Sequence, residues 1–82
     1  MPDTRIGVVG ILVQRSQSAP GINTILSEYR DIIVGRIGVP YRERGLAVIS
    51  LIIDGSTDEV GAMTGKLGRL EGVKVKTALL TT

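Results

Sequence analysis

Polar residues that could bind a small ligand follow the first apolar run of the sequence. The candidates are Gln14, Arg15, Ser16, Ser18, Gly21 and Asn23. A helix is expected to begin among them, because Ser18 can serve as its N-cap and Pro20 is tolerated in a first helical turn. The free N–H groups at a helix start favour an anionic ligand, so this loop is the first candidate binding site. A capped loop without a ligand is the competing interpretation.

A second candidate is a set of arginines around a predicted hairpin tip, namely Arg36, Arg42 and Arg44. Guanidinium groups bind carboxylates and phosphates through forked hydrogen bonds, so these side chains could contact an anion. Glu43 lies between two of them. Ion pairing within the turn or across a subunit interface is therefore the alternative.

Catalytic and metal-binding chemistry has little support in the composition. The sequence contains no Cys and no His, which removes thiol nucleophiles, disulfides, the commonest acid/base group and the commonest metal ligand. The carboxylates of Asp54, Asp58 and Glu59 are explained by turn and helix-cap positions, which leaves no pair of nucleophile and base. We therefore expect no enzyme activity, no cofactor and no metal site.

The spacing of apolar residues predicts the elements that position these candidates. Continuous or alternating apolar runs predict strands over residues 6–13, 32–39, 46–53 and 73–80, and helical spacing predicts helices over 19–29 and 57–70. Ser56 and Glu59 form a capping box for the second helix, and Gly72 is expected to cap its end. Gly45 offers a positive φ at the hairpin tip.

The resulting β-α-β-β-α-β order predicts an α+β, ferredoxin-like two-layer sandwich. In that topology the antiparallel sheet has the order 4132, with the first and third strands in the middle. This sequence places its most apolar strands there, and its strand with Arg36 and Pro40 at an edge. Residues 1–82 are expected to form one domain, because a chain of 82 residues is short for more than one core.

The two central strands are aliphatic on both faces, whereas two helices on one side of the sheet can cover only one face. Exposed apolar patches usually mark an interface, so we expect a homo-oligomer, either a dimer or a tetramer. The copies would join through the open sheet face, through the second strand, or through both. A tolerated bare face is the alternative.

Three glycines of the second helix, Gly61, Gly65 and Gly68, form a separate feature. Each costs about 1 kcal/mol relative to Ala in a helix. They permit either close approach of a backbone or ligand, or simply a thin surface face or a tight contact between helix and sheet.

The net charge is only +2, so we expect no direct contact with nucleic acid, and binding of DNA through a basic face is a minor alternative. No apolar run reaches the roughly 18 residues of a membrane span, and the N-terminus lacks a signal-peptide pattern. We expect a cytoplasmic protein that does not contact the membrane.

Several motifs resemble those of known regulatory families. The step Pro20-Gly21-Ile22 is similar to the Pro-Gly step that opens the first helix of many ACT domains. Residues 35–45, 48–51, 65–70 and 72–76 together resemble the family of iron-only hydrogenase system regulators, and the similarity covers essentially the whole chain. The resemblance implies a stand-alone ACT-like domain that is found with hydrogenase maturation proteins and has no catalytic residues.

ACT domains bind amino acids or other small effectors between domains, near the loop after the first strand, which implies a site at residues 14–23. The loop lacks the acidic residue that often precedes the Pro-Gly step in amino-acid-binding members. Metal binding by the related nickel-responsive repressors depends on His and Cys and is not implied. The first hypothesis is a small-molecule-binding regulatory module that acts through a separate DNA-binding or target protein; the second is a structural adaptor without a ligand.

Overall fold

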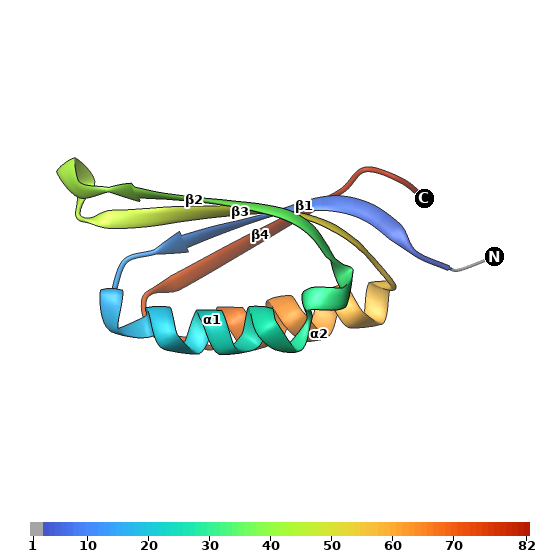
Figure 1. Ribbon diagram of the computed structural model, residues 1–82, viewed down its shortest axis with the longest axis horizontal. Coiled ribbons are helices and arrows are strands. Elements are labelled where there is room, and N and C mark those ends of the chain that lie inside the picture. Colours follow the sequence, from blue (N-terminus) through green and yellow to red (C-terminus); the bar gives the residue numbers. More distant parts are fainter. Residues whose placement is uncertain (1–2) are drawn as a thin grey trace.

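Two helices cover one face of a four-stranded antiparallel sheet in the computed structural model, which describes residues 3–82 (Figure 1). The elements are β1 (Arg5–Val13), α1 (Ala19–Glu28), β2 (Ile33–Tyr41), β3 (Leu46–Gly55), α2 (Thr57–Gly68) and β4 (Val73–Leu79). Short 3₁₀ turns lie at Ser16–Ser18, Arg30–Ile32 and Arg42–Arg44. The strand order β2-β3-β1-β4 confirms the predicted ferredoxin-like sandwich, with β1 and β3 in the middle.

The core between the sheet and the helices is aliphatic apart from one methionine. Successive strand residues point to opposite faces, so every second residue of β1 and β3 enters this core. Its most buried side chains, each at most 1% exposed, are Val9, Ile11, Leu51 and Ile53 from the sheet and Ile22, Met63 and Leu67 from the helices. The predicted apolar stripes of both helices are thereby confirmed.

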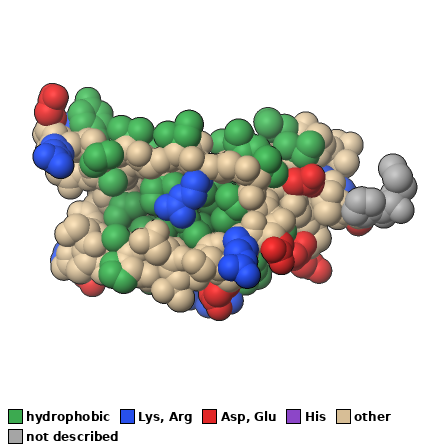
Figure 2. All heavy atoms as spheres, in the orientation of Figure 1, with side chains coloured by type: hydrophobic (Ala, Val, Ile, Leu, Met, Phe, Trp, Pro, Cys, Tyr) green, Lys and Arg blue, Asp and Glu red, His purple; other side chains and the backbone are tan. Residues whose placement is uncertain are grey.

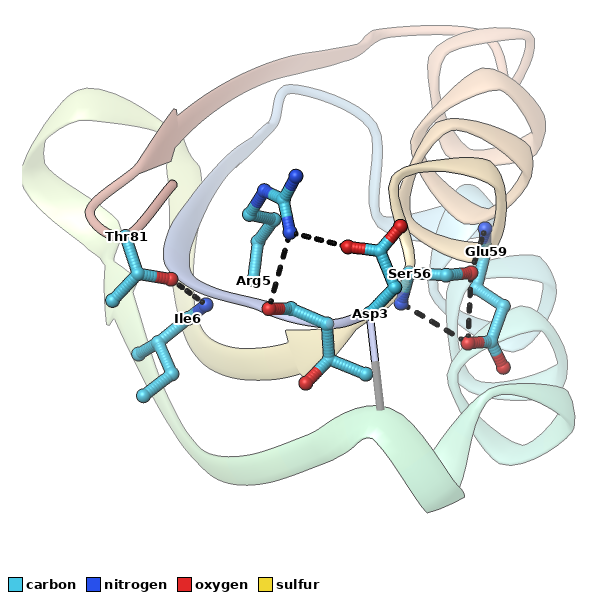
Figure 3. A network of polar contacts seen from close by, with 7 residues as sticks. Asp3, Arg5, Ile6, Ser56, Glu59 and Thr81 are labelled. Atoms are coloured by element: carbon cyan, nitrogen blue, oxygen red, sulfur yellow. Dashed lines mark hydrogen bonds and ion pairs between the residues drawn. The ribbon is translucent and has the colours of Figure 1, made fainter. Parts of the chain in front are cut away.

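Two local predictions of backbone geometry are confirmed. The Ser56 hydroxyl accepts from the Glu59 amide at 3.1 Å, and the Glu59 carboxylate accepts from the Ser56 amide at 3.1 Å, which completes the capping box (Figure 3). Gly45 has φ +66° at the tip of the β2–β3 hairpin. Beyond the sheet, the amide of Ile6 donates to the Thr81 hydroxyl at 2.8 Å, so the end of the chain lies against the start of β1 (Figure 3).

Two predicted helix caps differ from the structure. Ser18 occupies the predicted N-cap position of α1, but it makes no cap hydrogen bond, because its hydroxyl donates instead to the carbonyl oxygen of Glu71, 2.6 Å away. Gly72 does not cap α2, which ends at Gly68. Gly72 has φ +72° and forms the turn into β4. Both residues serve the contact between two loops that are distant in sequence.

The hairpin strands are longer than the sequence predicted. β2 continues through Pro40 and Tyr41, and β3 continues to Gly55. Ile32, expected to begin β2, lies in a 3₁₀ turn and is buried. Pro40 is compatible with a strand here because β2 lies at the edge of the sheet.

The glycines of α2 face open space. Apart from chain neighbours and the backbone of α2 itself, no heavy atom of residues 3–82 lies within 4 Å of a Cβ built on Gly61, Gly65 or Gly68. The interpretation as a tight contact between helix and sheet is therefore wrong, and the glycines form a thin exposed face on this helix.

This open space predicts a stabilised variant. Gly61→Ala combined with Gly65→Ala should raise the free energy of unfolding by about 1–2 kcal/mol, because alanine restricts the unfolded chain and fits the helix. The melting temperature should then rise by roughly 5–15 °C in a calorimetric scan. Ala62→Gly on the same helix is the matched control and should lower it. A double variant that melts at or below the wild-type temperature would contradict the prediction.

Candidate functional site

A groove of about 460 Å³ lies between the amino end of α1 and the β2–β3 hairpin, on the side of the sheet that carries the helices. The hairpin extends past the start of α1 (Figure 1). Figure 2 shows hydrophobic side chains in a hollow between the sheet layer and the helix layer on this side. The lining residues are Val13, Gln14, Ser16, Ala19, Ile22, Asn23, Pro40, Arg42, Gly45, Leu46, Ala47 and Ile49.

The structure divides the residues predicted to bind a ligand into two groups. Gln14, Ser16, Asn23 and Arg42 line the groove. Arg15, Ser18 and Gly21 are not among the lining residues and instead contact the segment that follows α2. Arg36 and Arg44 also lie outside the lining. Of the three hairpin arginines, only Arg42 therefore lines the same groove as the loop after β1.

The loop after β1 is attached to the turn before β4, and we call this contact the loop–turn junction (Gln14, Arg15, Ser18, Glu71 and Gly72). The Gln14 amide donates to the Gly72 carbonyl oxygen at 2.7 Å, and the Ser18 hydroxyl donates to the Glu71 carbonyl oxygen at 2.6 Å. The Arg15 guanidinium lies 3.8 Å from the Glu71 carboxylate. This junction holds the loop that forms one wall of the groove.

The polar groups of the groove are not committed to partners within the chain. Across residues 3–82, the side chains of Gln14, Ser16 and Asn23 make no hydrogen bond, and Arg42 makes no ion pair. Ala19, the first residue of α1, already donates its amide to the Ser16 carbonyl oxygen, and Pro20 has no N–H group. The four side chains can therefore bind a ligand without breaking an existing contact, whereas the first two residues of α1 offer no free donor.

Sequence reasoning missed the apolar half of the groove. Pro40, Leu46, Ala47 and Ile49 come from the hairpin, and the sequence pattern indicated only that they belong to strands. Their placement opposite α1 depends on how far the hairpin extends past the helix. The one available signal was the length of the apolar segments on both sides of residues 41–45.

The opposite face of the sheet, which we call the open face, carries no helix (Figure 1). Register places Val39 beside Val48 and Leu12, and Ile52 beside Val8, all on this face. Its most exposed large apolar residues are Ile37 at 67%, Val39 at 52%, Ile52 at 50%, Tyr41 at 46%, Ile6 at 44% and Val48 at 40%. The expectation that the chain leaves one aliphatic face uncovered is confirmed.

Charged groups elsewhere have structural roles. The Lys66 ammonium of α2 lies 5.0 Å from the ring centre of Tyr29 and 3.9 Å from the Glu28 carboxylate. Tyr29 and then Glu28 raise the pKa of Lys66 above its ordinary value.

Within residues 3–82 no cluster of His, Cys, Asp and Glu could hold a metal ion. None of the described helices is long and apolar enough to cross a membrane.

The fold is similar to those of ACT domains and PII-like proteins. The structure resembles the ACT domain from the GTP pyrophosphokinase of Chlorobium tepidum, with a TM-score of 0.69 and 18% identity over 98% of this chain and 90% of that one. It also resembles CPII, a nitrogen regulatory PII-like protein from Thiomonas intermedia K12 solved with ADP, AMP and bicarbonate, with a TM-score of 0.51 and 15% identity over 92% of this chain and 93% of that one. These likenesses show the fold alone.

A closer match gives the family. Residues 5–77 match the TM1266-like family, described as "Iron-only hydrogenase system regulator, putative". The uncharacterized protein TM1266 from Thermotoga maritima has a TM-score of 0.91 and 35% identity, over 95% of this chain and 99% of that one. This chain therefore belongs to the TM1266-like family, as the sequence motifs predicted. Among curated proteins, none matches the sequence significantly.

Proposed function

We propose that this chain is a non-catalytic regulatory domain of the iron-only hydrogenase system that binds a small effector in the groove and acts through contacts between copies of itself. The observation that carries the proposal is the groove, which combines aliphatic walls with the uncommitted polar groups of Gln14, Ser16, Asn23 and Arg42. Apolar walls with a few convergent polar groups are typical of small-molecule sites.

The open face supports the second half of the proposal. Its exposed aliphatic side chains, among them Ile37, Val39 and Ile52, would be shielded from water by a second copy. Four strands of seven to ten residues, with about 3.3 Å per residue and about 4.8 Å between strands, give a face of roughly 550 Å². Two such faces bury about 1,100 Å², just below the range for standard stable interfaces.

The β2–β3 hairpin connects the two surfaces. Pro40, Arg42 and Ala47 line the groove, whereas Val39 and Val48 lie on the open face. A ligand that changes the position of the hairpin would also change the surface presented to a second copy. The hairpin is therefore the element through which effector binding would alter assembly.

A structural adaptor without a ligand is the alternative function. It is favoured by the same open face, which would bind an apolar surface of another protein. In either case a separate DNA-binding or target protein would carry the signal, because a net charge of +2 gives little affinity for nucleic acid.

A thermal-shift screen with amino acids, carboxylates and nucleotides tests the proposal. A ligand at one hundred times its Kd should raise the melting temperature by roughly 10–20 °C, because it binds only the folded state. Sedimentation with and without the ligand should then show a change in assembly. Silence in the screen together with a stable complex with another protein would favour the adaptor. Silence together with an 8.7 kDa monomer would contradict both parts of the proposal.

A further inference from the structure

The groove has a single charged residue in its described lining, and its charge is positive. Arg42 is its only charged lining residue within the described part of the chain, and neither Asp nor Glu contributes to the lining. The remaining polar side chains, Gln14, Ser16 and Asn23, are neutral. The nearest acidic residue in the sequence of the turn, Glu43, is not part of the lining. The groove therefore supplies a counter-charge for an anion and none for a cation.

The apolar walls strengthen the effect of having a positive charge and no negative charge in the lining. Val13, Ile22, Leu46 and Ile49 exclude water from part of the groove, and an ionised group that loses water needs a charged partner. A carboxylate can pair with the Arg42 guanidinium, and the side-chain amides of Gln14 and Asn23 line the same groove as further hydrogen-bond donors. An ammonium group beside the carboxylate would meet only neutral acceptors and the like charge of Arg42.

From this lining we infer that the groove selects an aliphatic carboxylate that carries no ammonium group, and that it discriminates against the amino acid with the same carbon skeleton. The inference rests on the proposed effector-binding function and names the chemical class of its ligand. The volume of about 460 Å³ lies within the range of small-molecule sites, so the carbon chain can extend along the walls for several carbons.

Isothermal titration of the full chain with a matched pair of compounds tests the selection. 2-Oxooctanoate and 2-aminooctanoate share a carbon skeleton and a carboxylate and differ only at C2, which is a ketone in the first compound and carries an ammonium group in the second. The oxo acid should bind at least about tenfold more tightly, because desolvation of an unpaired ammonium opposes binding of the amino acid. Octanamide, which lacks the negative charge, should also bind more weakly than the oxo acid.

Arg42→Gln tests the residue that recognises the charge. Arg42 is exposed and makes no ion pair within residues 3–82, so this variant should fold normally. It should weaken binding of 2-oxooctanoate by about tenfold, and Arg42→Lys should restore part of that loss. Arg30→Gln removes the same charge beyond the other end of α1 and should leave the affinity unchanged.

The outcomes separate this inference from the proposed function. Equal binding of the oxo and amino acids, or an unaltered affinity in Arg42→Gln, would overturn the selection while leaving effector binding in place. Binding of nucleotides but of neither octanoate derivative would do the same. If no compound of any class binds, both the inference and the proposed effector function fail.

Discussion

The Ile52→Lys variant is expected to sediment as a monomer at concentrations at which the wild-type chain associates. Ile52 is half exposed on the open face, where it is paired in register with Val8 of β1. Association of two copies through this face would bury the new ammonium group among aliphatic side chains, and burial of an unpaired charge costs several kcal/mol. A loss of about 3 kcal/mol raises the dissociation constant more than a hundredfold.

The fold should survive this change, because the side chain at position 52 is not part of the core. Lys74 and Lys76 lie on the same face, so the added lysine also meets like charges there. Ser27→Lys, on the exposed side of α1, adds the same charge to the other layer and should leave association unchanged. Sedimentation velocity across micromolar concentrations measures all three proteins. An Ile52→Lys variant that associates like the wild type would exclude the open face as the interface.

Gly72→Ala is expected to lower the free energy of unfolding by about 2–4 kcal/mol, because two separate costs add at this position. Gly72 has φ +72°, which side chains rarely adopt. A Cβ there would lie 2.6 Å from Cγ and 3.3 Å from the backbone nitrogen of Arg15, so the loop–turn junction would have to open. The variant should also bind an effector more weakly, because the loop that forms one wall of the groove would shift.

Gly45→Ala is the matched control for this prediction. Gly45 has a similar φ of +66°, but apart from its chain neighbours no heavy atom of residues 3–82 lies within 4 Å of an added Cβ. It should therefore show only the backbone cost, about 1 kcal/mol. Urea unfolding of the two variants measures the difference. Equal losses would mean that the Arg15 side chain moves away from the added Cβ at no cost in stability, which would contradict the prediction.

The arrangement of the sheet could be predicted from the sequence because each strand shows its environment in its composition. β1 and β3 are apolar on both faces and lie in the middle, whereas β2 contains Arg36 and Pro40 and lies at an edge. The capping box at Ser56 was equally predictable, because its two partners are three residues apart. Each of these signals lies within a few neighbouring residues, so it can be recognised without knowing which distant segments come together in the fold.

The errors concern contacts between distant residues. Ser18 has the residue type and the position expected of a helix cap, yet its hydroxyl donates a hydrogen bond to the carbonyl oxygen of Glu71, 53 residues away. A tertiary acceptor competes with the local one, and no local pattern indicates it. The candidate site shows the same division: the loop supplied Gln14, Ser16 and Asn23 as predicted, whereas the hairpin walls required the three-dimensional arrangement.

The two borders of the sheet differ in a way that limits how large an assembly can grow. β4 alternates Lys74 and Lys76 with valines, whereas β2 is mainly aliphatic and carries a single charged residue, Arg36, together with Pro40. Within residues 3–82 no strand pairs with the outer side of β2. Charged side chains on an outermost strand oppose its pairing with another sheet. Two copies joined edge to edge through β2 would form one continuous eight-stranded sheet bounded on both sides by lysine-bearing strands. Pairing of strand edges then ends at two copies, and the continuous sheet does not propagate into a fibre.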